Sequence, residues 1–296
     1  MSILVGKGSR ILIQGITGRE ASMILPDMLK YGSKVLAGVT PGKGGQTIQG
    51  IPVYDSVKEA LDIHSEINTS LVYVPPFAAK QACMEALDNG IHLLNVVTER
   101  VPVRDSWAII KKAKELNARV IGPTSLGIIS PGKCKLGPIG GNDPSSVYQE
   151  GSIGVMSKSG GMTTETSWVL RLNDFGQSTA VGLGGDVLMG SMFTDLLPLF
   201  NEDQQTKAIV IFGELGGLQE NAVAEYVKHF GQPKPIVAFI AGKFSEHLPQ
   251  AIFGHAGAII QGGKDSPHEK IKELETAGIR VAKVHHEIGE ILKEVL

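Results

Sequence analysis

One histidine and one glutamate stand in settings suited to group-transfer chemistry. His255 lies in the segment IFGHAGAIIQGG (252–263), where small residues on both sides leave room for a bulky group to dock at the imidazole. Glu214 follows a strongly apolar stretch in IFGELGG (211–217), at the predicted carboxyl end of a parallel strand, where α/β proteins place ligand groups. A carboxylate there could accept a histidine N–H, fix its tautomer and raise its nucleophilicity. Taken alone, a single histidine is more often structural.

The segment MSKSGGMTTETSW (156–168) predicts an anion site at the start of a helix. A strand ends at Ser157, and the turn Ser159-Gly160-Gly161 leads into a helix whose N-terminal N–H groups favour a phosphate or carboxylate. A serine nucleophile is an alternative, although the G-x-S-x-G pattern is absent. Plain helix capping by Ser159 or Thr163 is another.

A second anion site is predicted in ILIQGITGREA (11–21). A buried strand leads into Gly15, which permits a tight turn, and Gly18, which allows a phosphate to approach the helix N-terminus. The next strand ends in AGVTPGKGG (37–45), which offers Lys43 and no carboxylate for ribose hydroxyls. A lysine there suits a ribose phosphate, as in coenzyme A (CoA) or NADP. No acid–base set typical of a dehydrogenase follows.

Alternating strands and helices must position these residues, and they predict two α/β domains with largely parallel sheets. The expected strands are 10–14, 34–39, 70–74, 91–97, 119–122, 152–157, 178–183, 207–212, 235–240 and 279–282. The expected helices are 19–31, 56–63, 77–89, 104–117, 161–174, 190–200, 219–229, 267–277 and 286–296. A segment rich in Gly and Pro interrupts the pattern. We expect domains at 1–125 and 147–296, joined by a connecting loop at 126–146.

Composition excludes several classes of protein. The chain has 296 residues, of which 42% are hydrophobic and 20% charged, so it can bury ordinary cores. Its net charge of -2 argues against a general nucleic-acid binder. Cys83 and Cys134 form neither a disulfide framework nor a zinc motif, and no metal site is expected. Without a membrane-length apolar run or a targeting segment, we expect a cytoplasmic protein.

A phosphoryl-transfer function for this chain implies a partner. A carboxylate does not react with a thiol at neutral pH, and it must first become an acyl phosphate. A neutral imidazole can take a phosphoryl group from a nucleotide and pass it to the acid. The chain has no G-x-x-x-x-G-K-[ST] loop and no second acidic constellation for a Mg²⁺–nucleotide. We therefore expect a partner subunit to carry the nucleotide.

A series of ordered motifs along the whole chain resembles the α subunit of succinyl-CoA synthetase, also called succinate–CoA ligase. The motifs are IQGITGRE, GVTPGKGG, VTERVP, GPTSLGIISPGKCKLG, SKSGGMTTE, GLGGD, GELGG and GHAGAII. The resemblance implies an N-terminal Rossmann-like CoA-binding domain and a C-terminal flavodoxin-like ligase domain. It also implies a phosphohistidine intermediate and a β subunit with an ATP-grasp fold, in an αβ or (αβ)₂ complex. That β subunit would bind most of the ATP or GTP with Mg²⁺.

The resemblance also implies roles for individual residues. His255 matches the phosphorylated histidine, and Glu214 matches the glutamate that holds it. The positions that match CoA contacts are Thr17, Gly18, Arg19, Glu20, Lys43, Val97, Thr98 and Glu99. The phosphate and the acid are expected at Ser159, Gly160, Gly161 and Thr164.

Three departures leave the acid open. Thr124-Ser125-Leu126 replaces Asn-Cys-Pro or Asn-Thr-Pro, Thr164 stands where a substrate-contacting tyrosine is common, and FSEHLPQAIF (244–253) lacks the usual arginine. These variants resemble the CoA-ligase module of ATP-citrate lyase and citryl-CoA synthetase, whereas GKGG and the chain length resemble succinyl-CoA synthetase. Succinate, citrate, malate or another acid, ATP or GTP, and the assembly stay open. A rival class is a non-catalytic CoA- or nucleotide-binding regulator, which would need no reactive histidine.

Overall fold

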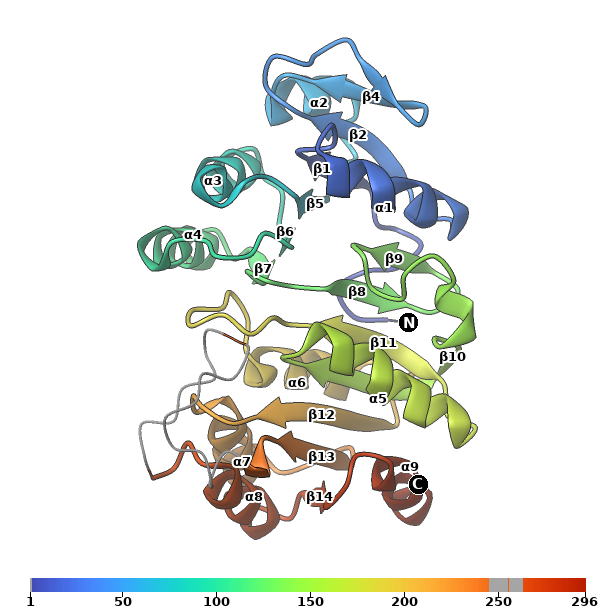
Figure 1. The fold of residues 1–296 in the computed structure, drawn as a ribbon, viewed down its shortest axis with the longest axis vertical. Coiled ribbons are helices and arrows are strands. Elements are labelled where there is room, and N and C mark those ends of the chain that lie inside the picture. The colour runs from blue at the N-terminus through green and yellow to red at the C-terminus, as the bar shows by residue number, and fades with distance from the viewer. Residues whose placement is uncertain (1, 245–254, 256–262) are drawn as a thin grey trace.

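The molecule consists of two β-sheets that lie one above the other, each flanked by helices (Figure 1). A computed structural model describes residues 2–244, 255 and 263–296. Along these residues strands and helices alternate, as the sequence pattern predicts, and the α/β fold class is confirmed.

The first sheet is parallel except at one edge. Its order is β3-β4-β2-β1-β5-β6-β7, and only β3 runs antiparallel to its neighbour. The strands are β1 Ile11–Gln14, β2 Val35–Val39, β3 Thr47–Ile48, β4 Ile51–Tyr54, β5 Thr69–Val72, β6 Leu93–Val96 and β7 Arg119–Ile121. The helices are α1 Arg19–Lys30, α2 Val57–Ile63, α3 Ala79–Asp88, which follows the short η1 Pro76–Ala78, and α4 Val103–Glu115.

The second sheet has a parallel body and an antiparallel edge. Its order is β14-β13-β12-β10-β11-β8-β9, with β8 antiparallel to both β11 and β9. The strands are β8 Gly127–Ser130, β9 Cys134–Leu136, β10 Glu150–Ser157, β11 Gln177–Gly182, β12 Ala208–Glu214, β13 Ile236–Ala241 and β14 Arg280–Ala282. The helices are α5 Gly160–Leu172, α6 Phe193–Glu202, α7 Gln219–Phe230, α8 Pro267–Thr276 and α9 Glu287–Val295, with a short η2 at Pro144–Ser146.

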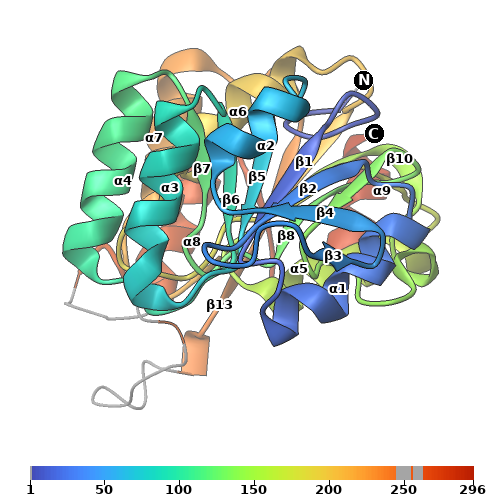
Figure 2. The same ribbon diagram turned by 90° about the horizontal axis from the view of Figure 1, so that it is seen from above.

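Burial on both faces explains why the central strands are short, continuous apolar runs. In the first domain α2, α3 and α4 cover one face and α1 covers the other, and Figure 2 shows α3 and α4 together on the side away from α1. In the second domain α5 and α9 cover one face, and α6, α7 and α8 the other. Helix α1 buries Ala21, Leu25 and Met28, a spacing that keeps them on one side of the helix.

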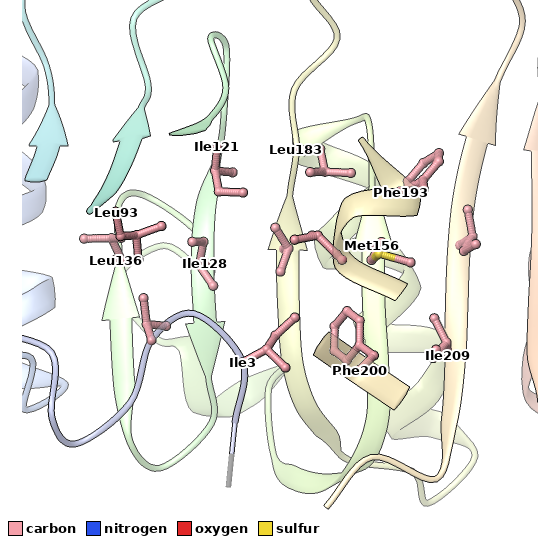
Figure 3. Close-up of a cluster of buried hydrophobic side chains, with 14 of the residues drawn as sticks. Ile3, Leu93, Ile121, Ile128, Leu136, Met156, Leu183, Phe193, Phe200 and Ile209 are labelled. Carbon is pink, nitrogen blue, oxygen red and sulfur yellow. The ribbon is translucent and has the colours of Figure 1, made fainter. Parts of the chain in front are cut away.

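One hydrophobic cluster runs through both domains. It joins Leu93 and Ile121 of the first sheet to Ile128 and Leu136 on the β8–β9 hairpin (Figure 3). It continues to α6 and the second sheet through Phe193, Phe200, Met156 and Ile209. Because close-packed cores resist deformation, this shared cluster holds the two carboxyl edges in one arrangement.

The expected elements agree with the structure, and two hairpins were missed. All ten predicted strands and all nine predicted helices are present, with ends that differ by a few residues. The prediction that 126–146 is only a connecting loop was wrong, because this segment supplies β8 and β9 to the second sheet. The β3–β4 hairpin was also not predicted, since its strands are very short and one contains Pro52. Within the described residues no helix is long and apolar enough to cross a bilayer.

Candidate active site

An open groove of about 870 Å³ lies at the carboxyl edge of the first sheet. The start of α1 and the loops after β5 and β6 form its walls. The predicted CoA-contacting residues in its lining are Gly18, Arg19, Glu20, Val97, Thr98 and Glu99. The structure thus brings together two predicted sets that are far apart in the sequence, at the sheet edge where α/β proteins bind ligands.

Backbone contacts give this groove its shape. Gly15 follows β1 with a φ of 81°, and a Cβ there would lie 2.5 Å from the carbonyl oxygen of Tyr73, so a side chain would collide with the loop after β5. The Val97 N–H donates to the Val72 carbonyl (3.1 Å), and the Thr98 hydroxyl donates to the Val74 carbonyl (2.8 Å). The walls are therefore tied together, while the side chains of Arg19 and Glu20 stay exposed.

Thr17 and Lys43 do not line the groove, and they lie on two turns that contact each other. Thr17 Oγ1 is 3.2 Å from Thr40 Oγ1, and the Lys43 N–H donates to the Thr40 carbonyl (3.0 Å). The Lys43 side chain is exposed, and its turn is held by the Gly44 N–H, which donates to Asp55 (2.8 Å). Their contact with CoA stays a prediction.

A smaller pocket of about 100 Å³ adjoins both regions, since it shares Val74 with the groove and includes Pro41 from the Lys43 turn. Gln14 and Gly15 at the end of β1 form its floor together with Gln81 and other residues of the η1–α3 segment. This pocket was not predicted from the sequence, although Gly15 and Pro41 lie in the two segments that predict the anion site and three parallel strands end here.

The second carboxyl edge holds the predicted histidine–glutamate pair. Glu214 is the last residue of β12, and His255 Nδ1 lies 2.9 Å from each of its carboxylate oxygens. The His255 side chain is 28% exposed and that of Glu214 13%, so the pair is largely shielded yet reachable. A carboxylate only accepts hydrogen bonds, so Nδ1 carries the proton and Nε2 holds the lone pair of the neutral ring. The neighbours Gly254, Ala256 and Gly257 lie outside the described residues, as do 245–253, so the room expected around the ring stays a prediction.

Charges on both domains act on His255. The hydrogen bond that His255 donates to Glu214 raises the pKa of His255, burial opposes this effect, and the net result is a pKa above the ordinary value. The nearby Lys158 ammonium lowers this pKa, and the Glu99 carboxylate of the first domain raises it. The groove lining is therefore electrostatically coupled to the histidine across the domain boundary.

The loop after β11 packs directly against the imidazole. A Cβ at Gly185 would lie 2.3 Å from both Cγ and Nδ1 of His255, so the ring rests on bare backbone. In the same GLGGD segment, the Asp186 carboxylate accepts a long hydrogen bond from the Thr124 hydroxyl (3.4 Å), and the Thr124 N–H donates to the Thr98 carbonyl (3.1 Å). Sequence analysis gave GLGGD no role of its own, although its paired glycines after a strand were a usable signal.

Helix α5 begins at the predicted SGG turn. Ser159 is the N-cap and its side chain accepts the Met162 N–H (3.4 Å), so the helix cap predicted as an alternative is present in the structure. The cap leaves the N–H groups of Gly160 and Gly161 to an anion, and Gly161 faces open space. Thr164 Oγ1 lies 3.2 Å from the hydroxyl of Tyr148. Because β10 and β12 are neighbouring parallel strands, this turn and Glu214 share one sheet edge.

Comparisons with known proteins match both halves of the chain to known families. Residues 7–100 match the family described as CoA binding domain, and residues 156–281 match the family described as CoA-ligase. A protein of Archaeoglobus fulgidus named succinate–CoA ligase (ADP-forming) subunit alpha 2 is 44% identical over 297 residues, which cover 100% of both chains. A Staphylococcus aureus protein named succinate–CoA ligase (ADP-forming) subunit alpha is 41% identical, over 99% of this chain and 95% of the relative.

A solved structure of ATP citrate lyase from Methanosaeta concilii, in complex with (3S)-citryl-CoA, superimposes with a TM-score of 0.91 at 27% identity. The match covers 99% of this chain and 50% of that chain, so this chain spans half the length of the lyase.

The two matched domains, with the groove at the carboxyl edge of the first sheet, define an acid–thiol ligase of the acid–CoA class. Within that class, the chain belongs to the succinate–CoA ligase α-subunit family.

Proposed function

We propose that this chain is the α subunit of an ADP-forming succinate–CoA ligase and that His255 carries a phosphoryl group between nucleotide and acid. The observation that supports this most directly is the pair of 2.9 Å contacts between His255 Nδ1 and the Glu214 carboxylate. Relatives of 41% and 44% identity that carry this name support the choice of succinate and of ADP.

In the proposed reaction His255 acts as nucleophile and Glu214 as the residue that orients it. Nε2 attacks the phosphoryl group, an N–P bond forms, and the bond from phosphorus to the nucleotide oxygen breaks. The ring gains positive charge as the new bond forms, and Glu214 stabilises that charge through Nδ1–H. Transfer of the phosphoryl group to the acid carboxylate returns the neutral imidazole.

We place the transferred phosphoryl group and the acid at the start of α5. The N–H groups at Gly160 and Gly161, together with the positive end of the helix dipole, favour negative charge there. Ser159 shapes the turn, and Thr164, near Tyr148, contributes a hydroxyl to the acid side of the site.

We place CoA along the carboxyl edge of the first sheet. In this arrangement the start of α1, with Arg19, receives the pyrophosphate, and the Lys43 ammonium meets the ribose phosphate. The small pocket beside Pro41 takes the adenine, and the thiol end runs along the Thr98–Glu99 loop towards His255. The field of Glu99 at His255 supports this direction.

The proposed complex contains a second subunit. The relatives are named as alpha subunits, and the chain lacks a P-loop sequence, so we propose a β subunit with an ATP-grasp fold that binds most of the ATP and Mg²⁺.

Citrate is the second candidate for the acid. It is favoured by the likeness to ATP citrate lyase and by Thr164, a small residue that leaves more room than a tyrosine.

Thioester formation by the purified complex tests the proposal. The chain would be co-purified with its β subunit and incubated with CoA, ATP and either succinate, citrate or malate, with an acid-free control. We expect ADP and succinyl-CoA, and γ-labelled ATP should leave an acid-labile, base-stable label on this chain. A faster reaction with citrate would reassign the acid, and the absence of both label and thioester would reject the ligase function.

A further inference from the structure

A buried ionic cluster lies directly behind the Glu214–His255 pair. Glu220, in the first turn of α7, and Lys270, on α8, have completely buried side chains, and that of Lys158 is only 7% exposed. Lys270 Nζ lies 2.6 Å from Glu220 Oε2, and Lys158 Nζ lies 3.0 Å from Glu220 Oε1. Buried charges are costly unless they are paired and hydrogen-bonded, so such a cluster needs a reason.

The cluster holds the backbone of Glu214 from both sides. The Glu214 N–H donates to Glu220 Oε1 (3.1 Å), and Lys270 Nζ donates to the Glu214 carbonyl (2.7 Å). Lys270 also donates to the carbonyl of Gly216 (2.6 Å), so each of its three protons has an acceptor. A Cβ at Gly213 would lie 2.7 Å from Glu220 Cγ, and the chain therefore admits this carboxylate only because position 213 is glycine.

The charges of the cluster determine the ionisation of Glu220 and also act on His255. Burial raises the pKa of Glu220, but the ammonium groups of Lys158 and Lys270 outweigh burial and lower it, so Glu220 is ionised. Lys158 also faces His255, where it opposes the charges of Glu214 and Glu99. Lys158 and Lys270 balance Glu214 and Glu220 formally, but Glu99 of the first domain adds a third carboxylate, in line with the raised pKa of His255.

We infer that Glu220 is a positioning residue for the His255 reaction: clamped between Lys158 and Lys270, it fixes the backbone of Glu214 and thereby the approach of that carboxylate to the imidazole. The inference rests on the proposed phosphoryl transfer by His255. Lys158 has a separate part in it, because its ammonium lowers the pKa of the imidazole against the effect of Glu214 and faces the negative charge of the phosphorylated ring.

Two variants of the complex with opposite expected effects on the pH profile test the inference. The readout is the rate of label transfer from γ-labelled ATP to His255, which rises as the imidazole loses its proton. In Glu220→Gln the Glu214 carboxylate is no longer fixed and two ammonium groups lose their counter-charge. Both changes lower the pKa of His255, so the midpoint of the acid limb should move to lower pH. The maximal rate should fall about 10- to 100-fold, the cost of misplacing a catalytic group by about 1 Å.

Lys158→Met keeps Glu220 paired with Lys270 and removes a positive charge that faces His255. The midpoint should therefore move to higher pH, with a smaller loss of maximal rate than in Glu220→Gln. Leu292→Ala, in the buried core under α9 on the face of the second sheet opposite α7 and α8, is the matched control for a destabilised fold. It should leave the midpoint in place.

If Glu220→Gln does not assemble, the double variant Glu220→Gln/Lys270→Met removes the opposite charges together, which buried pairs tolerate better. It should show the same loss of rate, because the Glu214 carbonyl has lost its donor. Wild-type rates and midpoints in these variants, or a shift of the midpoint in Leu292→Ala as well, would overturn the inference. A wild-type complex without label on His255 would instead reject the proposed function on which it rests.

Discussion

The carboxyl edges of the two sheets differ in how far their ionisable groups are exposed to solvent. At the first sheet the groove is open, its walls are held by backbone hydrogen bonds, and Arg19, Glu20 and Lys43 are exposed. At the second sheet the ionisable groups around Glu214 are buried or shielded, and the carboxylate, N–H and carbonyl of Glu214 each have a partner.

In the proposed function, this difference separates CoA binding from the phosphoryl transfer. A long, charged ligand is held by many contacts along exposed backbone, and each contact contributes modestly. A reacting group needs a fixed direction and a controlled protonation state, which burial and paired charges provide. Substitutions at the second edge should therefore act on rate, and those at the first edge on CoA affinity.

Replacing His255 should have the largest effect. His255→Asn removes the proposed phosphoryl acceptor, and both label and ATP-dependent turnover should disappear. CoA affinity, measured by calorimetry on the complex, should be unchanged because the groove lies on the other sheet. Label that persisted on another histidine would show that the wrong residue is assigned.

Glu214→Gln should slow phosphorylation about 100-fold, the low end for acid–base assistance, because the amide accepts a hydrogen bond but lacks the charge. Glu214 raises the pKa of His255, so wild-type phosphorylation should fall as the pH drops through a midpoint above the ordinary histidine value of about 6.5. Without the carboxylate this midpoint should move to lower pH. Phosphorylation rates measured by rapid quench from about pH 5.5 to 8.5 would test this shift. An unchanged midpoint would mean that Glu214 does not raise the pKa of His255.

Gly185→Ala should slow phosphorylation about 10-fold or more, because the new Cβ would lie 2.3 Å from the His255 ring and displace it. Gly8→Ala is the control, since no atom lies within 4 Å of a Cβ at that site. Single-turnover labelling should separate the two variants while CoA affinity stays equal. Equal labelling rates would mean that the ring does not rest on Gly185 when it reacts.

Lys43→Ala should have the smallest effect, a loss of CoA affinity of about 10-fold, as for one charge-assisted contact to a phosphate. Dephospho-CoA should bind both forms equally well. Lys114→Ala, an exposed lysine on α4, serves as the control. If CoA and dephospho-CoA lost affinity alike, the ribose phosphate would lie elsewhere in the groove.

Much of the fold followed from local patterns. Runs such as Ile11–Gln14 and Ala208–Glu214 are apolar and bounded by turn residues, and helices such as α1 and α8 carry a single buried stripe. The β8–β9 hairpin escaped prediction because its residues lie in a segment rich in Gly and Pro. Its strand character depends on pairing with β11, which comes some 50 residues later.

The sequence by itself determined the order of the elements, the family and the residue types able to do the chemistry, among them His255, Glu214 and the SGG turn. These depend on neighbours along the chain, which the sequence displays directly. Only the tertiary structure decided that Glu220 and Lys270 grip Glu214, that Gly185 supports the imidazole, and that Lys43 stands apart from the groove. Such contacts join segments that are distant along the chain, and they exist only once the packing of the core has placed the two sheet edges side by side.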